Sequence, residues 1–437
     1  MSSISEFFKL KENRTSIGTE VRAGIATFLT MAYIIIVNPV ILSKTGMPFA
    51  GILFATVLVA AISSILMGLI ANLPFAVAPG MGLNAFFAFS LCLGMGVKWQ
   101  TALGVVFISG IIFLILTITG VRESIIKSIP ESLRYGVAAG IGLFLSIIGL
   151  TSVKFIVSSP ATTVAFGGLN TTTVLFLIGL AITGFLVARN VKGSLIIGII
   201  STSILALIAS KVIPGAESLL SIPTEAVALP SLDVFFQLDI LGALTLGMIV
   251  PIFTFLFTDI FDSLSTFLGV SEVGGFIEKN GQPRNVGKAL FVDAIATTIS
   301  GLFGTSSGTT YIESASGVEE GGRTGLTAVV TGLLFLPFMF LSPLLSFVPT
   351  VATAPILVLI GLFMMKPVAK IKWDDYEESI PAFLALILIP LTYSITQGIV
   401  WGFLSYTILK ILKGKISELP IMLYIIDAFA ILSLVVH

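Results

Sequence analysis

Two aspartates stand three residues apart in a segment that is otherwise almost entirely apolar. The segment reads Phe253-Thr-Phe-Leu-Phe-Thr-Asp-Ile-Phe-Asp-Ser-Leu-Ser-Thr-Phe267. On a helix, this spacing places the carboxylates of Asp259 and Asp262 on one face. Two close carboxylates in a low-dielectric environment do not readily ionise together, so one of them is expected to hold a proton. Such a group, without a basic partner, suits proton coupling; the alternative is a protonated aspartate that hydrogen-bonds a neighbouring helix backbone.

A third carboxylate, Glu313, follows the polar run Gly308-Thr-Thr-Tyr311 at the predicted start of a short helix. A negative charge is favourable at a helix N-terminus. The carboxylate can accept bonds from two adjacent N–H groups of a ligand, and the free amides of the helix offer donors. Together they can recognise a flat heterocycle, with Thr310 and Tyr311 in the same predicted binding segment. Helix capping alone is the alternative interpretation.

Two further polar residues are expected near the same centre. Asn84 is neutral but can both donate and accept hydrogen bonds, so we predict ligand contact or support of the site, with an interhelical hydrogen bond as the alternative. Asp293, in Phe291-Val-Asp-Ala-Ile-Ala296, is predicted to be a structural partner of unwound backbone nearby and to support proton coupling.

The composition indicates a polytopic membrane protein. Of 437 residues, 56% are hydrophobic and 11% are charged, whereas a soluble domain has about twice that charged share. Lys plus Arg equals Asp plus Glu, at 23 each, which argues against a nucleic-acid partner. The single histidine, His437, and the single cysteine, Cys92, argue against a zinc site, histidine catalysis and an internal disulfide. No HExxH, GxSxG or CxxC motif is present, so we predict no enzyme, metal or cofactor.

Twelve long apolar segments and two broken ones predict the membrane crossings. The broken segments, 74–89 and 304–317, are interrupted by Gly with Pro or by a Gly, Ser and Thr run, so each is predicted as an extended stretch followed by a half-length helix. Counted as spans 3 and 10, they give fourteen. The twelve long segments are 21–43, 50–71, 100–120, 134–153, 171–188, 193–211, 240–269, 287–303, 324–346, 349–365, 379–396 and 397–412.

The distribution of basic residues sets the predicted orientation. With fourteen spans, 19 of the 23 lysines and arginines fall on one side of the membrane, and only Lys44, Lys98, Lys154 and Lys211 fall on the other. Because cytoplasmic loops are enriched in Lys and Arg, both termini are predicted to be cytoplasmic, in a multi-pass protein of the cell inner (plasma) membrane. The polar segment 1–20 lacks a cleavable signal. The apolar tail within 416–437 is predicted to be an interfacial or re-entrant helix.

The two broken segments also mark an internal repeat. Asn84 and Glu313 occupy equivalent places 229 residues apart, about half the chain, with seven predicted spans in each half. An odd number of spans inverts the second half relative to the first. Inverted repeats are typical of secondary transporters, whose sites lie at the midplane where broken helices meet.

Four motifs resemble the AzgA-like purine permeases, the adenine, guanine and hypoxanthine branch of the nucleobase–cation symporter 2 (nucleobase/ascorbate transporter) group. The motifs are Phe28-Leu-Thr-Met-Ala-Tyr-Ile-Ile-Ile-Val-Asn-Pro39, Ala78-Pro-Gly-Met-Gly-Leu-Asn-Ala-Phe-Phe87, Phe257-Thr-Asp-Ile-Phe-Asp262 and Tyr311-Ile-Glu-Ser-Ala-Ser-Gly-Val-Glu-Glu-Gly-Gly-Arg-Thr-Gly325. The resemblance extends over nearly the whole chain.

This resemblance implies a seven-plus-seven inverted repeat, a homodimer in lipid, and elevator-like movement of a core domain against a gate domain. The core domain would comprise 21–120 (spans 1–4) and 236–346 (spans 8–11). The gate domain would comprise 121–212 (spans 5–7) and 347–415 (spans 12–14).

The resemblance also assigns roles to residues. Asn84, Asp259 and Glu313 match positions that the family uses for purine binding and transport, and Asp262 matches a supporting acid. Relatives that carry uracil, xanthine or ascorbate often have a histidine where this chain has Ser263, which disfavours those substrates. The hypothesis is proton-coupled uptake of guanine, hypoxanthine or adenine. The alternatives are another nucleobase (xanthine or uracil), a small anion, a channel and a membrane enzyme.

Overall fold

The computed structural model describes residues 2–120, 130–213, 225–278 and 283–436, and these are mostly helical. Ten helices of the described residues are long and apolar enough to cross a membrane, and two shorter apolar helices, Met81–Gly94 and Gly325–Phe340, coincide with predicted spans 3 and 11. A multi-pass membrane protein is therefore confirmed. The full count of fourteen spans and the inverted orientation of the halves stay predictions.

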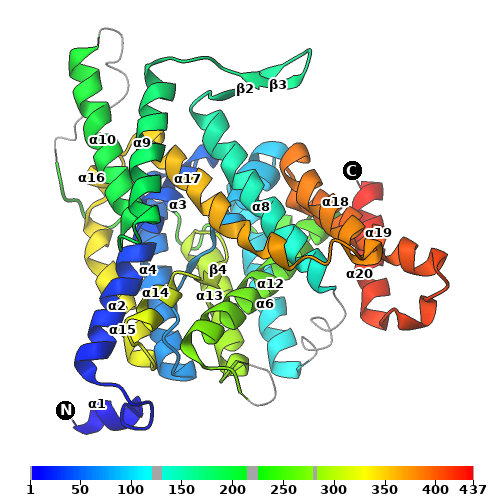
Figure 1. The fold of residues 1–437 in the computed structure, drawn as a ribbon, viewed down its shortest axis with the longest axis horizontal. Helices are drawn as coiled ribbons and strands as arrows, with labels where there is room; N and C mark the ends of the chain where they lie inside the picture. The colour runs from blue at the N-terminus through cyan, green and yellow to red at the C-terminus, as the bar shows by residue number, and fades with distance from the viewer. Residues whose placement is uncertain (1, 121–129, 214–224, 279–282, 437) are drawn as a thin grey trace.

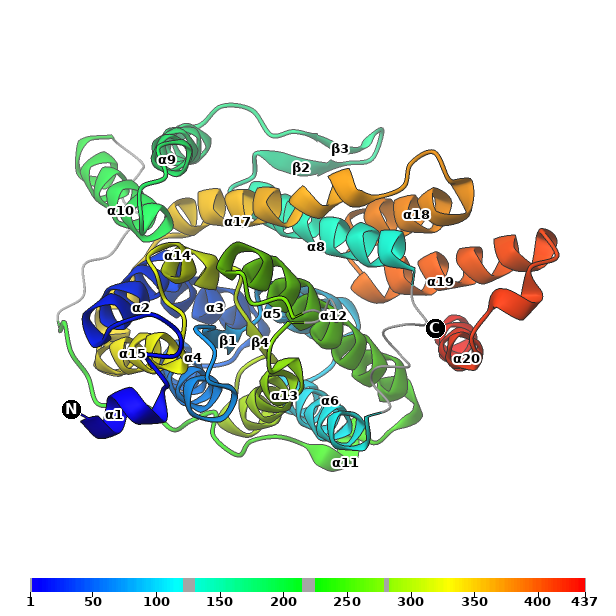
Figure 2. The same cartoon turned by 60° about the horizontal axis from the view of Figure 1, so that its bottom comes forward.

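The helices form two groups that lie face to face (Figure 2). Helix α6 packs on α13, and α15 packs on α2 and α4 in the larger group, whereas α8 packs on α17 and α18 in the smaller group. The larger helix group comprises α2 (Ile17–Met31), α3 (Ile34–Leu42), α4 (Phe49–Leu66), α5 (Met81–Ala85), α6 (Trp99–Thr119), α12 (Ile249–Gly274), α13 (Val286–Phe303), α14 (Ser314–Glu319) and α15 (Gly325–Phe335). The smaller helix group comprises α8 (Glu131–Ser152), α9 (Thr171–Ala188), α10 (Ser194–Val212), α17 (Thr350–Met364), α18 (Tyr376–Thr392) and α19 (Ile395–Leu412).

Short elements connect or flank these groups (Figure 1). They are α1 (Ser2–Phe7), the hairpin of β2 (Ile156–Ser159) and β3 (Thr163–Phe166), α11 (Ile240–Ala243), α16 (Ser342–Leu345) and α20 (Ile421–Val436). Single-turn 3-10 helices are η1 (Ser43–Thr45), η5 (Leu246–Met248), η6 (Leu336–Phe340), η7 (Lys366–Lys370) and η8 (Ile416–Glu418), and π-helical turns are η2 (Met67–Ala71) and η3 (Phe86–Gly94).

Polar caps set where the apolar helices begin. The side chain of Ser16 accepts from the Thr19 amide at the start of α2, and Asn170 forms a capping box with Thr173 at the start of α9. Such caps satisfy amides that have no partner within the helix. Prolines account for one difference from the sequence prediction. The predicted span 324–346 leaves α-helical geometry after Phe335, and Pro337 lies in the 3-10 turn that follows, because proline has no N–H to donate.

The two broken segments lie side by side at the centre of the larger helix group. Strand β1 (Val77–Pro79) pairs antiparallel with β4 (Gly308–Thr310), with Ala78 opposite Thr309. Strand β1 leads into α5 and its π-helical continuation η3, and β4 is followed closely by α14. An extended stretch followed by a short helix is therefore confirmed in both segments. A Cβ atom on Gly308 would lie 2.8 Å from the Ala296 Cβ of α13, so only glycine allows this close approach.

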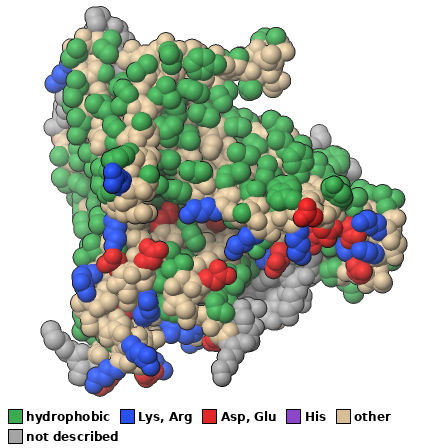
Figure 3. Space-filling view, viewed as in Figure 1, with side chains coloured by type: hydrophobic (Ala, Val, Ile, Leu, Met, Phe, Trp, Pro, Cys, Tyr) green, Lys and Arg blue, Asp and Glu red, His purple; other side chains and the backbone are tan. Residues whose placement is uncertain are grey.

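Charged side chains gather at one end of the molecule. In Figure 3 they are concentrated at the end that carries α1 and alongside α18 and α19, while most of the remaining visible face is hydrophobic. One acid at this end, Glu20 of α2, is buried. Its carboxylate accepts hydrogen bonds from the amides of Arg323 and Thr324, which precede α15, and from the hydroxyl of Thr327 in the first turn of α15. A carboxylate at a helix N-terminus is favourable, so Glu20 joins α2 to α15.

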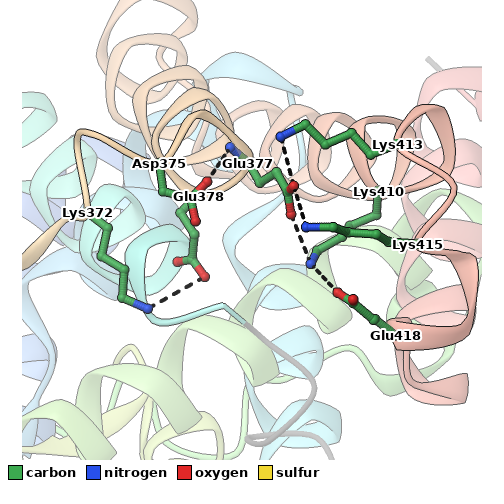
Figure 4. Close-up of polar contacts among 8 residues, drawn as sticks. All are labelled: Lys372, Asp375, Glu377, Glu378, Lys410, Lys413, Lys415 and Glu418. Atoms are coloured by element: carbon green, nitrogen blue, oxygen red, sulfur yellow. Dashed lines mark hydrogen bonds and ion pairs between the residues drawn. The ribbon is translucent and has the colours of Figure 1, made fainter.

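A second charged cluster joins α18, α19 and the segment before α20 (Figure 4). The buried Glu377 carboxylate lies 3.0, 2.8 and 2.7 Å from the ammonium groups of Lys410, Lys413 and Lys415, and Lys410 also contacts Glu418. Hydrogen bonds from these three lysines lower the pKa of Glu377 to about 2.

Helix α20 confirms that the apolar tail is helical, and it contacts both helix groups (Figure 2). The carboxylate of Asp427 accepts a hydrogen bond of 2.6 Å from Thr407 of α19, and the Phe429 ring stacks on Phe253 of α12 at 5.3 Å between centroids. Its interfacial placement stays a prediction.

Candidate functional site

A cavity of about 70 Å³ lies between the two helix groups, where the two broken segments meet. The larger helix group supplies its polar wall, and α17 closes it with two apolar side chains. The lining residues are Tyr33, Gly80, Met81, Gly82, Asp262, Thr266, Thr309, Thr310, Tyr311, Ile312, Glu313, Ile360 and Met364. This lining holds two carboxylates and no lysine, arginine or histidine, so the cavity offers acceptors and no cationic partner for an anion.

Glu313 is positioned by a tyrosine from the first predicted span. The span breaks between α2 and α3, and Tyr33 at the break donates a hydrogen bond of 2.7 Å from its hydroxyl to Glu313 Oε1. This leaves Oε2 to a ligand. Tyr311 lines the same cavity and donates its hydroxyl hydrogen to the carbonyl of Pro79, which ties β4 to the end of β1.

The backbone donors differ from those expected. The first amides of α14 are engaged, since Ser314, Ala315 and Ser316 bond the carbonyls of Tyr311, Ile312 and Glu313. At the start of α5, by contrast, the first amide that donates to a carbonyl of the same turn is that of Asn84, which bonds the Gly80 carbonyl. No such bond is formed by the Met81 or Gly82 amide among the described contacts. The amides of Met81 and Gly82 on the cavity wall are thus the donors that the half-helices offer.

Asp262 and Asp259 occupy different environments although they share one helix. Asp262 lies on the cavity wall and is partly exposed. Asp259 is buried one turn away, where its Oδ2 lies 2.5 Å from the Thr297 hydroxyl of α13. Thr297 also lies 3.0 Å from the Gly308 carbonyl, so Asp259 contacts the support of β4 and does not line the cavity.

Asp293 lies beside Asp259 in this buried region. Its Oδ1 accepts a hydrogen bond of 2.9 Å from the Thr310 hydroxyl, which joins α13 to the end of β4. Asp259 Oδ1 and Asp293 Oδ2 have no hydrogen-bond partner among the described residues. No ion pair within the described ranges involves either aspartate.

Asn84 lies behind the cavity wall in an amide network. Its Nδ2 donates to Asn38 Oδ1 at 3.0 Å, and Asn38 in turn donates to the hydroxyls of Thr56 at 2.7 Å and Thr305 at 2.9 Å. The network joins α3, α4, α5 and the segment before β4. This arrangement corresponds to the interhelical hydrogen bond named as the alternative for Asn84.

The structure thus brings Asp262, Thr310, Tyr311 and Glu313 together on the cavity wall and places Asn84, Asp259 and Asp293 behind it. Sequence reasoning did not select Tyr33 or Asn38 as site residues. Both belong to the Phe28–Pro39 motif, where polar side chains interrupt an apolar span, and that interruption was the available signal.

Comparison with known proteins gives several full-length relatives. A putative permease of Methanocaldococcus jannaschii is 46% identical over 98% of this chain and 97% of its own length. The adenine permease AdeP of Escherichia coli strain K12 is 42% identical over 99% of this chain and 96% of its own. The guanine/hypoxanthine permease PbuG of Bacillus subtilis strain 168 is 43% identical over 95% of this chain and 96% of its own.

Solved structures show the fold. The transmembrane domain of a cyanobacterial bicarbonate transporter, BicA, matches with a TM-score of 0.65 at 17% sequence identity, covering 87% of this chain and 97% of that domain. The all-α polytopic membrane fold predicted from sequence is therefore confirmed. A family model described as the permease family matches residues 18–401, in agreement with the motif resemblance, so the chain belongs to this permease family and is a transporter, not an enzyme.

Proposed function

We propose that this permease is a proton-coupled symporter that takes up purine nucleobases such as adenine, guanine or hypoxanthine. The observation that carries the proposal is a cavity whose wall holds Asp262 and Glu313 and no basic side chain. Such a wall favours a neutral ligand rich in N–H donors. Relatives named as adenine and as guanine/hypoxanthine permeases, each matched over nearly its full length, support the same substrate class.

The contacts define how a purine would be held. Two adjacent purine N–H groups would donate to Glu313, whose Oε1 is already fixed by Tyr33. The amides of Met81 and Gly82 would donate to ring nitrogens or to an exocyclic oxygen. The polar residues behind the wall, Asn84 and Asp259, would support the backbone that binds the ligand. The buried acids Asp259 and Asp293 would hold the coupling proton.

The arrangement of the two helix groups supports an elevator mechanism. The larger helix group would be the core domain (21–120 and 236–346), and among the described residues it carries every polar residue of the cavity. The smaller would be the gate domain (121–212 and 347–415), and its described part contributes only Ile360 and Met364. A second cavity, of about 360 Å³, lies near the other end of the same interface and is bordered by Ser90, Gln397 and Tyr393. Sliding of the core along an apolar gate surface would expose the purine site to each side in turn. Homodimerisation, an inner-membrane location and cytoplasmic termini complete the proposal.

A small anion is the second candidate, because the fold is shared with a bicarbonate transporter. A fold similarity at 17% identity gives no information on the substrate. A cavity lined by two carboxylates and no basic side chain disfavours binding of an anion.

The test is uptake of radiolabelled hypoxanthine in cells that lack their own purine carriers. Adenine, guanine, xanthine and uracil would be added as unlabelled competitors, with and without a protonophore. We expect saturable uptake that adenine or guanine competes and that collapses with the proton gradient. Glu313→Gln should lower uptake at least about tenfold, because the amide nitrogen cannot accept a hydrogen bond. Full uptake with unchanged affinity in this variant would refute the role of Glu313.

A further inference from the structure

Two hydroxyl groups connect the acid on the cavity wall to the buried acids behind it. The Oγ of Ser263, on α12, and the Oγ1 of Thr309, on β4, lie 2.9 Å apart, and either can donate to the other. Ser263 is completely buried and does not line the cavity, whereas Thr309 reaches the cavity wall. The pair therefore spans the wall that separates the cavity from the buried region.

Each hydroxyl also faces one carboxyl group. The Thr309 hydroxyl lies near Asp262 and the Ser263 hydroxyl lies near Asp293, but neither pair forms a hydrogen bond among the described contacts. The order of groups is Asp262, Thr309, Ser263 and Asp293, with Thr310 fixing the far side of Asp293. Proton-transfer contacts are often long in ligand-free structures and shorten when a ligand binds.

We propose that Ser263 and Thr309 form a two-hydroxyl relay that carries the coupling proton between Asp262 on the cavity wall and the buried Asp293. This inference rests on the proposed proton-coupled transport and adds the path that the proton takes. The relay is needed because a bound purine occupies the cavity, while Asp293 has no direct opening to it.

The transfer balances without any other reactant. Protonated Asp262 gives its proton to Thr309 Oγ1, Thr309 gives its own hydroxyl hydrogen to Ser263 Oγ, and Ser263 gives its hydrogen to the Asp293 carboxylate. One O–H bond forms and one breaks at each hydroxyl, so both end neutral. The net change is one proton moved from Asp262 to Asp293, and the reverse sequence returns it.

The surroundings of Asp293 favour its protonated form. A buried carboxylate without a cationic partner is energetically costly, and protonation removes that cost. The titratable groups around the relay are Asp259 and Asp262 on α12, Asp293 on α13, Tyr311 and Glu313 next to α14, and Tyr33 between α2 and α3. None of the ion pairs in the described part of the chain includes one of these acids.

The test separates proton movement from purine movement in proteoliposomes. Purine-driven proton influx is read with an internal pH dye, and exchange of internal for external labelled hypoxanthine is read in the same vesicles without a gradient. In Ser263→Ala we expect influx per purine to fall at least about tenfold, while exchange, which needs no net proton movement, falls less than about twofold. Ser271→Ala is the control, because Ser271 is also buried on α12 and its hydroxyl has no partner among the described contacts.

If Ser263→Ala fails to fold, a pair of variants at Thr309 tests the relay instead. Thr309→Val removes the hydroxyl at nearly constant volume, and Thr309→Ser keeps it. We expect Thr309→Ser to retain purine-driven proton influx and Thr309→Val to lose it. Equal coupling in Ser263→Ala and Ser271→Ala, or in Thr309→Val and Thr309→Ser, would overturn the relay. Net purine uptake without any purine-driven proton influx in the unaltered protein would instead overturn proton coupling itself, and the relay with it.

Discussion

Replacing Tyr33 by phenylalanine tests whether Glu313 must be held in place to bind a ligand. The substitution removes one oxygen atom and with it the 2.7 Å hydrogen bond to Glu313 Oε1. Hydrogen bonds to charged groups contribute about 1.5–3 kcal/mol. Glu313 is partly exposed, so water can replace the lost donor and the lower end of that range applies. Since about 1.4 kcal/mol is a factor of ten, we expect purine affinity to fall about tenfold.

The assay is concentration-dependent hypoxanthine uptake in cells without their own purine carriers, with protein amount measured in the same membranes. The apparent KM should rise about tenfold, by the same reasoning on the lost hydrogen bond, with a smaller change in maximal rate. Tyr406→Phe on α19 is the matched control, because Tyr406 lies outside the cavity lining. An affinity for Tyr33→Phe within twofold of the unaltered protein would refute the reasoning, because it would mean that the ligand does not depend on an oriented Glu313.

Two further predictions concern stability. A Cβ atom on Gly325 would lie 2.0 Å from the Gly68 carbonyl oxygen, so Gly325→Ala should destabilise the protein by about 1–3 kcal/mol in thermal unfolding, whereas Gly184→Ala, with open space around its Cβ, should be neutral or slightly stabilising. The pKa of Glu377 is lowered to about 2 by its three lysines, so its contribution to stability should be complete above pH 4.5 and lost as the pH falls toward 2. Glu377→Gln should flatten the melting temperature across that window, and an unchanged pH dependence would contradict the assignment.

The membrane architecture was accessible from sequence because lipid imposes a simple rule. Backbone groups in the bilayer must be paired within the chain, so each crossing appears as a long apolar segment. The same rule identified the two exceptions at 74–89 and 304–317, since broken backbone is tolerated only where protein or a cavity replaces lipid. Pairing of β1 with β4 provides the missing partners for that backbone. What the sequence did not reveal was the pairing itself, because it joins residues more than 200 positions apart.

The candidate site was predictable in residue types but not in the position of each side chain. An acid in an apolar span is conspicuous whether it faces a ligand or a second helix, and spacing alone places Asp259 and Asp262 on one face. The structure separates them, because Thr297 of α13 covers Asp259 while Asp262 reaches the cavity between the two helix groups. That separation depends on tertiary packing, which no local pattern encodes.

The separation has a consequence for how one protein can couple two ligands. If both acids lined the cavity, a bound purine and the proton would compete for the same oxygen atoms. With Asp262 and Glu313 on the wall and Asp259 and Asp293 behind it, the proton of the proposed mechanism would have a place that the purine does not reach. The buried acids contact Thr297 and Thr310, which in turn contact or belong to β4. In the proposed mechanism, a change of protonation there would alter the contacts that hold one wall of the proposed purine site. A single strand of three residues would then make the occupancy of one site depend on the other.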